Sequence, residues 1–549
     1  MNNIFKPKLF TLIREGIPKK QIISDVFSGI IVGIVALPLA IAFAVASGVS
    51  PEKGMITAIV AGFIISFLGG SRVQIGGPTG AFVIILFGIV EQYGIDGLFI
   101  STIMAGVILV IFGLLKLGSL LKYFPHPLIV GFTSGIALVI LSTQIKDALG
   151  LNIEHLPSDF MEKWDVYFTN ISTFNPFALA VTLLTIMIVI FSKHITSKIP
   201  GSFIAIILLT LCVNIFNIEV TTIESFFGTI SSDITFSIPN FELIDLKIYI
   251  VPALIIALLG SIESLLSAVV ADGMIGTNHR SNTELIAQGI ANIVTPLFGG
   301  IPATGAIART ATNVKNGGRT PIAGIVHSIA LLLIMIFFMN YAKLIPMSVL
   351  AGILIVVAYN MSEWRSFISI IKGSPFDSIV LVSTFLLTVL VDLTVAIQVG
   401  IVLASLLFMK RMADINTNIA FEDDSDMMEN YTNLSKDISV YEIAGPLFFA
   451  SAKKYAETIY SVGYNSKILI IRMRYVPFVD LTALHNLKAT IESLKAAGLI
   501  IIMSGTVDNV YKDLKNNGII DILGEENIFK EFSMAIEYAN NLIKEKNEI

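Results

Sequence analysis

Long apolar segments recur from about residue 27 to residue 407, and they limit the fold more than any other feature. Lipid offers no hydrogen-bond partners to the backbone, so apolar runs of this length predict membrane-spanning helices. The composition agrees, because 54% of residues are hydrophobic and only 14% are charged, whereas soluble domains carry about a quarter charged residues. We therefore predict an all-α membrane protein with about fourteen spans, some shorter than the roughly 20 residues of a full crossing.

The composition changes after the last apolar segment, which predicts four regions. These are a basic N-terminal segment (residues 1–24), a transmembrane domain (25–412), a linker (413–436) and a C-terminal domain (437–549). In the last region, short β-like runs such as "KILIIRMRYV" alternate with helical stretches such as "LTALHNLKATIESLKAAG". This alternation is typical of an α/β layer domain.

The positions of the basic residues indicate the orientation of the spans. The N-terminal segment has no cleavable signal peptide and is rich in cations, namely Lys6, Lys8, Arg14, Lys19 and Lys20. With this end in the cytoplasm, the connections that carry Arg72, Lys116, Arg280, Arg319 and Lys410 all fall on the same side. The positive-inside rule then predicts that both termini are cytoplasmic.

Two similar glycine- and proline-rich motifs interrupt the apolar pattern. The first motif, "GGPTGAF" (residues 76–82), falls at the predicted third span, and the second motif, "GIPATGAIA" (residues 300–308), falls at the tenth. An odd offset between equivalent segments means that they enter the membrane from opposite faces, which indicates an inverted repeat of seven plus seven helices. Irregular backbone at membrane depth must be buried in protein or line a wet cavity, so we expect a half-helix to begin after each motif.

Two helix N-termini that face each other across a cavity form a candidate site for a small anion, because free backbone N–H groups and two positive dipole ends meet there. Thr79 and Thr304 each offer a hydroxyl, and Gly80 and Gly305 leave the amides uncovered. Ala303 belongs to the same predicted site. A single such motif would more simply allow close helix packing, but two in opposed orientation favour the anion site.

The predicted eighth span contains an ionisable residue, Glu263, near its middle. A carboxylate at that depth costs at least a few kcal/mol and normally marks an ion or proton pathway. Ser267 lies four residues further on, on the same helical face. We interpret Glu263 and Ser267 as a cation-coupling site; the alternative is a protonated or hydrogen-bonded structural glutamate.

Arg309 lies about one turn inside the half-helix that follows the second motif. It either pairs with Glu263 or adds positive potential for the substrate, and the sequence leaves both alternatives open. In the first span, Pro38 should interrupt the helix, and Phe43 would follow the break as a wall of the cavity.

Several classes of function are excluded or disfavoured by missing signals. The sequence has no metal-ligand cluster, no phosphate-binding loop of the ATPase type, and no basic cluster typical of nucleic-acid binding. The single cysteine, Cys212, cannot form an intrachain disulfide. Ser281 and Glu284 match a capping-box pattern. We expect neither enzymatic activity nor a cofactor. The candidate coupling ion is Na⁺, bound at Glu263, Ser267 and Thr304.

Four segments together resemble the SulP family of inorganic anion transporters: "ALPLAIAFAVASGVSP", "QIGGPTGAF", "IESLLSAVVADGM" and "GGIPATGAIARTATNVKNGGRTPIAG". The resemblance implies core and gate subdomains in a seven-plus-seven repeat, an elevator-type movement, homodimers in a bacterial inner membrane, and a C-terminal STAS domain. Carried over to this chain, the family's substrate site comprises Phe43, Thr79, Glu263, Thr304, Gly305 and Arg309.

Within that family, the chain looks most like the Na⁺-coupled bicarbonate transporters. Leu39 stands where sulfate-type members have a glutamine, and Glu263 with Ser267 stands where the bicarbonate transporters have aspartate and threonine. The longer Glu263 leaves H⁺ coupling open beside Na⁺. In the STAS-like region, Leu481 occupies the phosphorylatable position, which excludes a serine switch there, although Thr482 remains a weak candidate.

The resulting hypothesis is a secondary active transporter of a small inorganic oxyanion, bicarbonate first, by Na⁺ or H⁺ symport. The alternatives are a sulfate or dicarboxylate transporter or exchanger, and a STAS-linked membrane sensor or scaffold. The expected partners are the substrate anion, membrane lipid, a second copy of the chain and a cytosolic protein that binds the STAS domain, with no nucleic acid.

Overall fold

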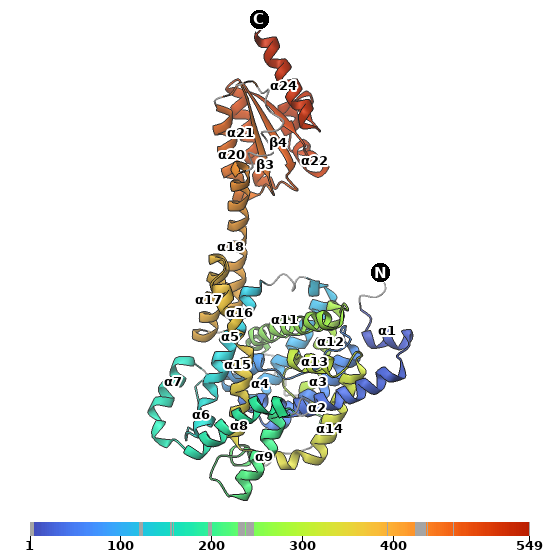
Figure 1. The fold of residues 1–549 in the computed structure, drawn as a ribbon, viewed down its shortest axis with the longest axis vertical. Coiled ribbons are helices and arrows are strands. Elements are labelled where there is room, and N and C mark those ends of the chain that lie inside the picture. The colour runs from blue at the N-terminus through green and yellow to red at the C-terminus, as the bar shows by residue number, and fades with distance from the viewer. Residues whose placement is uncertain are drawn as a thin grey trace. The chain divides into compact units, whose positions relative to one another are not determined.

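The computed structural model describes residues 5–119, 125–153, 156–157, 159–195, 200–228, 236–237, 246–391, 393–422, 435, 437–464 and 466–547. The chain divides into two compact units, Met1–Ile401 and Val402–Ile549 (Figure 1). The division falls within the long helix α18 (Leu393–Glu422), which covers the first part of the predicted linker. Residues 423–434 and 436 of that linker lie outside the described part of the chain.

The first unit is built from helices. They begin with α1 (Lys8–Glu15), α2 (Lys19–Ala46), α3 (Pro51–Leu68), α4 (Gly80–Leu114), α5 (His126–Thr143), α6 (Ile145–Leu149), α7 (Phe160–Thr169), α8 (Pro176–Ile195) and α9 (Gly201–Ile215). They continue with α10 (Ile223–Phe227), α11 (Ile250–Ile275), α12 (Ser281–Val294), α13 (Ile307–Lys315), α14 (Ile322–Ala342), α15 (Met347–Met361), α16 (Trp364–Ile371) and α17 (Pro375–Leu390).

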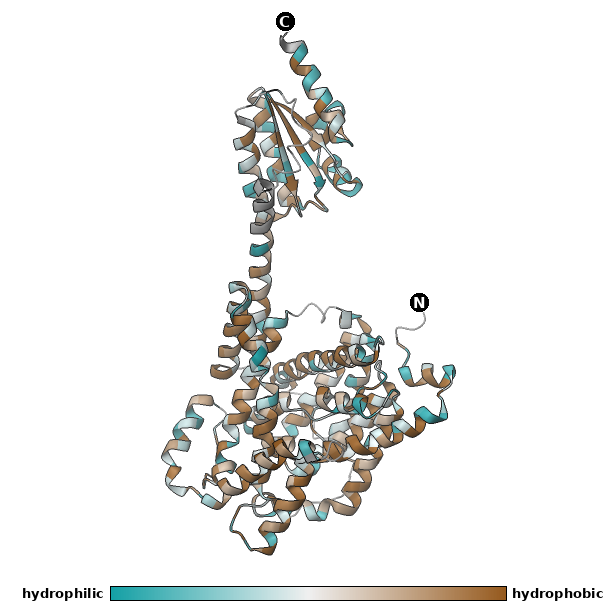
Figure 2. Ribbon diagram, in the orientation of Figure 1, coloured by the Kyte–Doolittle hydropathy of each residue, from teal (hydrophilic) through white to brown (hydrophobic). Residues whose placement is uncertain are grey.

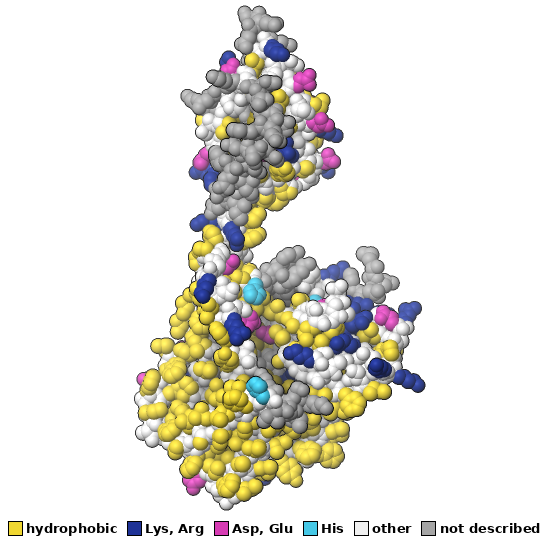
Figure 3. Space-filling model, viewed as in Figure 1, with side chains coloured by type: hydrophobic (Ala, Val, Ile, Leu, Met, Phe, Trp, Pro, Cys, Tyr) yellow, Lys and Arg dark blue, Asp and Glu magenta, His cyan; other side chains and the backbone are white. Residues whose placement is uncertain are grey.

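Within the described residues, 8 helices are long and apolar enough to cross a membrane. Three shorter apolar helices lie at Pro176–Ser192, Gly201–Ile215 and Pro375–Leu390, and α4 is two helices joined across a kink at Gly94. The apolar helices dominate this unit (Figure 2), and hydrophobic side chains cover much of its visible surface (Figure 3). The chain is thus an integral multi-pass membrane protein, while the total of about fourteen spans stays a prediction.

Helices of the first unit approach one another closely at glycines. Where α4 crosses α12, a Cβ on Gly106 would lie 2.6 Å from the carbonyl oxygen of Gly289, and a Cβ on Gly289 would lie 2.6 Å from that of Gly106. Where α3 crosses α2, a Cβ on Gly54 would lie 2.0 Å from the carbonyl oxygen of Ala40. Such contacts between small residues are how membrane helices gain packing energy.

The predicted break at Pro38 is wrong, because α2 runs without interruption from Lys19 to Ala46. Proline removes one backbone hydrogen bond, but a helix packed on both sides can tolerate that loss. α2 packs closely against α3 and α14, and Ala36, Pro38 and Ala40 are all buried. Phe43 consequently lies on a continuous helix.

The predicted capping box at Ser281 and Glu284 is also wrong. The residue before α12 is Arg280, and no side chain caps this helix. Glu284 instead accepts hydrogen bonds from the backbone N–H groups of Gly70 (2.8 Å) and Ser71 (3.0 Å), and from the amide of Gln288 (2.9 Å). Its carboxylate thereby joins the end of α3 to the start of α12.

The second unit is an α/β domain, as predicted. Four strands, β3 (Ile438–Ala444), β4 (Ile468–Tyr475), β5 (Ile500–Ser504) and β6 (Ile528–Phe529), form one parallel sheet in that order. The helices are α20 (Phe449–Tyr464), α21 (Leu481–Ala496), α22 (Asp508–Asn516), α23 (Ile519–Leu523) and α24 (Phe532–Asn547). α20, α21, α22 and α23 cover one face of the sheet and α24 covers the other, which explains why β4 is buried on both faces.

Candidate anion-binding site

The two predicted motifs meet in space although more than two hundred residues separate them. Strand β1 (Gly76–Gly77) pairs antiparallel with β2 (Thr304–Gly305), so that Gly76 lies opposite Gly305 and Gly77 opposite Thr304. The backbone N–H of Ala306 also donates to the carbonyl of Ile75 at 2.8 Å. The pairing satisfies backbone groups that would otherwise be exposed to lipid.

A helix begins near the end of each motif, close to the place that the sequence predicts. α4 starts at Gly80 with Thr79 as its N-cap residue, and α13 starts at Ile307 with Ala306 as its N-cap residue. Neither N-cap side chain bonds to its own helix. Both helix starts therefore keep N–H groups and positive dipole ends that can serve an anion.

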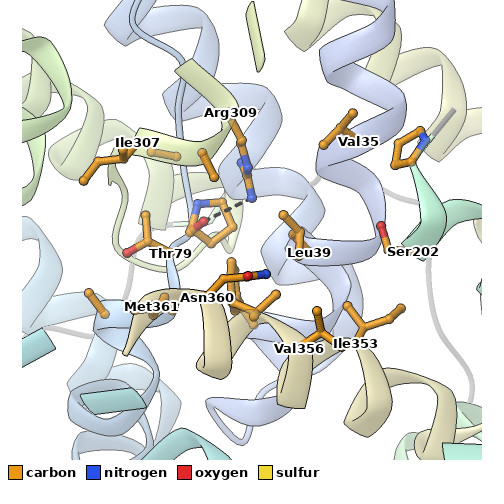
Figure 4. Close-up of a pocket in the computed structure, with 18 of the residues that line it drawn as sticks. Val35, Leu39, Thr79, Ser202, Ile307, Arg309, Ile353, Val356, Asn360 and Met361 are labelled. Atoms are coloured by element: carbon orange, nitrogen blue, oxygen red, sulfur yellow. Dashed lines mark hydrogen bonds between the residues drawn. The ribbon is translucent and has the colours of Figure 1, made fainter. Parts of the chain in front are cut away.

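Both helix starts open onto one cavity of about 700 Å³. Residues of α2, α4, α5, α8, α9, α11, α13 and α15 contribute to its wall. The lining is mostly apolar, and its residues include Val35, Leu39, Phe43, Pro78, Thr79, Gly80, Thr133, Ser202, Glu263, Ala306, Ile307, Arg309, Ile353, Val356, Asn360, Met361 and Glu363. Figure 4 shows Arg309 extending from α13 toward Leu39 and Asn360.

Among the described residues that line this cavity, Arg309 is the only cation. Its side chain is 1% exposed, and its Nη2 donates to the carbonyl oxygen of Pro78 at 3.1 Å (Figure 4). Its Nη1 is buried and has no hydrogen-bond partner. Gly77 leaves the room for this group, because a Cβ there would lie 2.2 Å from Nη1. Arg309 and Glu263, both described, form no ion pair within 4 Å, which leaves the guanidinium available to a ligand.

The hydroxyls of the two motifs differ in their surroundings. Thr79 lines the cavity, and its Oγ1 is buried without a hydrogen-bond partner. Thr304 is fully buried behind the wall, where its Oγ1 lies 2.6 Å from Ser264 Oγ and donates to the carbonyl of Gly260 at 3.1 Å. Ala303 and Gly305 also lie outside the lining; Ala303 exchanges two hydrogen bonds of 2.8 Å with the side chain of Asn292.

Of the predicted cation-coupling pair, Glu263 lines the cavity and Ser267 does not. Glu263 is 8% exposed, and among the described residues its carboxylate has neither a hydrogen bond nor an ion pair. Ser267 is fully buried and donates to Thr310 Oγ1 at 3.3 Å. An unpaired carboxylate in a largely apolar wall is costly, so it either binds a cation or takes up a proton.

Sequence reasoning missed four polar residues of the lining, Thr133, Ser202, Asn360 and Glu363. Glu363 interacts electrostatically with Glu263 and has a left-handed backbone (φ 42°), which is uncommon for a residue other than glycine. Asn360 lies in the last turn of α15 and Glu363 lies just after this helix, where polar residues are expected in any membrane protein. The pattern "AYNMSEW" therefore carries no signal that separates them from an ordinary helix end.

Comparisons with known proteins show which family the chain belongs to. The sulfate permease family model matches residues 22–384, and the STAS domain model matches residues 432–535. YvdB of Bacillus subtilis (strain 168), which is named for sulfate transport, is 41% identical over 508 residues, covering 92% of this chain and 95% of YvdB. The bicarbonate transporter BicA of Picosynechococcus sp. is 31% identical over 503 residues, covering 86% of this chain and 87% of BicA.

Solved structures share the fold. The transmembrane domain of a cyanobacterial BicA superposes with a TM-score of 0.64 at 30% identity, covering 69% of this chain and 98% of that domain. The murine anion transporter Slc26a9 in its inward-facing state superposes with a TM-score of 0.85 at 18% identity, covering 97% of this chain and 94% of that chain. The chain is therefore an anion transporter that belongs to the sulfate permease family, with a C-terminal STAS domain.

Proposed function

We propose that the chain is a secondary active transporter that moves a small oxyanion, bicarbonate first, together with Na⁺ or H⁺. One observation carries this proposal: two buried hydrogen-bond donors without partners, Thr79 Oγ1 and Arg309 Nη1, belong to the wall of the same cavity at the start of α4. A buried donor without a partner costs about 1–3 kcal/mol. A bound anion would satisfy both donors.

The charge of the wall favours a monovalent anion. Among the described lining residues, the cation is Arg309 and the carboxylates are Glu263 and Glu363. A divalent anion would be poorly neutralised there, since burying unpaired charge in an apolar wall is expensive. Leu39 leaves the first-span side of the cavity apolar. The likeness to BicA supports bicarbonate, and the likeness to YvdB keeps sulfate as the second candidate.

We propose that coupling runs through Glu263. A protonated or cation-bound Glu263 would leave Arg309 as the uncompensated charge on that side of the wall, so cation binding and anion binding would favour each other. We also propose that the helices that carry both motifs move as a body in an elevator-type cycle. Homodimers in a bacterial inner membrane, with both termini cytoplasmic, complete the proposal.

Uptake of radiolabelled bicarbonate into proteoliposomes tests the proposal. The assay is run at alkaline pH, where little of the label is membrane-permeant CO₂, with and without an inward Na⁺ gradient or H⁺ gradient. We expect accumulation driven by one of the two cations and resistance to excess sulfate. Strong competition by sulfate, or by succinate, would instead favour a broader anion carrier. Tight anion binding without flux would favour a sensor or scaffold.

A pair of variants tests the coupling residue. Glu263→Gln should abolish cation-driven accumulation, because the carboxylate that holds the cation is lost. Glu363→Gln is the matched control, since it removes an exposed carboxylate from the same cavity. Unchanged cation dependence in Glu263→Gln would overturn the assignment, and a loss that occurs only in Glu363→Gln would transfer the role to that residue.

A further inference from the structure

Helix α1 carries apolar side chains on two sides, one buried and one exposed, and the residues proposed for transport do not explain the exposed side. Leu9 and Leu12 are buried at 4% and 6% exposure, whereas Phe10 and Ile13 are exposed at 43% and 59%. An eight-residue helix with two apolar sides needs a second apolar environment besides the protein. Contact of these exposed apolar side chains with water would be unfavourable.

Helix α1 is firmly attached to the unit that carries the motifs. The backbone N–H of Lys8 donates to the carbonyl of Gly69 at the end of α3, at 2.9 Å. Nη1 of Arg280, at the start of α12, donates to the carbonyl of Lys6 at 2.6 Å and to Thr11 Oγ1 at 2.9 Å. The position of α1 is therefore fixed by hydrogen bonds to two helices.

The exposed apolar side of α1 is continuous with the surface of a membrane-spanning helix. Phe10 contacts Phe67 of α3 edge to face, with ring centroids 5.5 Å apart, and Phe67 stacks on Phe63 at 5.8 Å. Phe63 and Phe67 are themselves exposed at 42% and 36% on this span. The same lipid chains that contact α3 would extend along α1.

Cations gather beside this apolar surface. Arg280 donates to Lys6 and Thr11, and Arg72 lies 3.9 Å from Glu15, so both guanidinium groups lie against α1. Burial and these two cations lower the pKa of Lys8, while Asp272 and Glu15 raise it. The Nε of Arg72 is buried without a hydrogen-bond partner, and its nearest carboxylate, that of Glu15, is 3.9 Å away from Nη2. Figure 3 shows Lys and Arg side chains gathered on the part of this unit where Figure 1 labels α1.

We propose that α1 and the adjoining end of α3 form a binding site for an anionic phospholipid. The phosphate lies against Lys8 and Arg72, and the acyl chains lie along Phe10 and Phe67. Positive charge and exposed apolar surface next to a span are the two properties that such a lipid requires. The proposal is independent of which anion the protein transports.

The test is a titration with phosphatidylglycerol of the full-length protein in nonionic detergent. The melting temperature of the protein is measured at each lipid concentration. A ligand that binds only the folded state raises the melting temperature with its concentration. We expect phosphatidylglycerol to raise it and phosphatidylcholine to leave it nearly unchanged. Glycerol phosphate, which has the charge without the acyl chains, should also have little effect; a shift equal to that of phosphatidylglycerol would overturn the lipid site in favour of a soluble phosphate ligand.

Three variants locate the site. Lys8→Gln with Arg72→Gln should weaken phosphatidylglycerol binding about 30-fold, because each cation near anionic lipid contributes about 1 kcal/mol. Phe10→Ser, which changes an exposed side chain, should also weaken it and guards against misfolding of the double variant. Lys343→Gln is the matched control, since Lys343 pairs with Glu224 on a different part of the unit. If phosphatidylglycerol raised the melting temperature of the double variant and of Phe10→Ser as it does that of the wild type, the proposal would be overturned.

Discussion

The two motifs are nearly equivalent in sequence but not in the structure. In the first motif, Thr79 lines the cavity with an unpartnered hydroxyl. In the second motif, Thr304 lies behind the wall and bonds to Ser264 and Gly260 of α11. Helix α13, which begins in the second motif, contributes Arg309 to the cavity instead, as its third residue.

This difference shows how two similar motifs can contribute different parts of one site. The first motif offers a neutral donor, the hydroxyl of Thr79, and an open helix start. The second motif leads into the helix that carries the charged Arg309, and the bond from the Gly305 N–H to Ser264 holds the β1–β2 pair against α11. Substitutions at equivalent positions should therefore have different effects, on transport in one motif and on stability in the other.

The largest effect is expected for Arg309→Gln. Loss of the cavity's cation should lower the catalytic efficiency of uptake about 100-fold, since a hydrogen bond to a charged group contributes about 1.5–3 kcal/mol. Initial uptake rates over a range of anion concentrations measure it. Arg309→Lys is the matched control, because it keeps the charge and should recover part of the rate. Near-normal uptake by Arg309→Gln would contradict the assignment of Arg309 to the anion site.

A smaller effect, on stability, is expected for Gly305→Ala. A Cβ there would lie 1.5 Å from Nε2 of the buried Gln74, which donates to the carbonyl of Ser264 at 3.0 Å. The displaced amide should cost about 1–3 kcal/mol of stability. Gly80→Ala is the counterpart in the first motif, where the nearest atom is the flexible Met361 Sδ at 3.0 Å. Equal melting temperatures for the two variants would contradict the proposed division of roles.

Thr304→Val should destabilise the protein by about 1–2 kcal/mol, because it removes a hydroxyl that is bonded on two sides in a buried place. Uptake per folded molecule should change little. Thermal unfolding in detergent checks the first statement and uptake normalised to folded protein checks the second. Thr304→Ser keeps the hydroxyl and should stay close to the wild type. A strong rise in KM without loss of stability would mean that Thr304 reaches the anion after all.

The sequence could predict the half-helices and five residues of the wall (Phe43, Thr79, Gly80, Glu263 and Arg309) because these depend on local signals. Glycine and proline interrupt an apolar run, and Glu263 and Arg309 are charges where charge is costly; all of these can be recognised without knowing the fold. The same reasoning could not separate Thr79 from Thr304, because the difference depends on Ser264, a residue of another helix. Pro38 and Glu284 were misjudged for the same reason, since contacts with α3, α14 and the Gly70–Ser71 backbone decide their surroundings.

The smallest effect is expected for Thr79→Val, and it tests the comparison most directly. The valine fits the same space, and since the Oγ1 of Thr79 has no partner to lose, the melting temperature should not fall. The KM for the anion should rise about 5-fold, since one neutral hydrogen bond contributes about 1 kcal/mol. Thr79→Ser should restore the wild-type KM. In the double variant with Thr304→Val, the effects on KM and on stability should simply add, because the two hydroxyls have different partners. A melting temperature lowered by Thr79→Val as much as by Thr304→Val would instead mean that both motifs are anchors, and that Arg309 alone selects the anion.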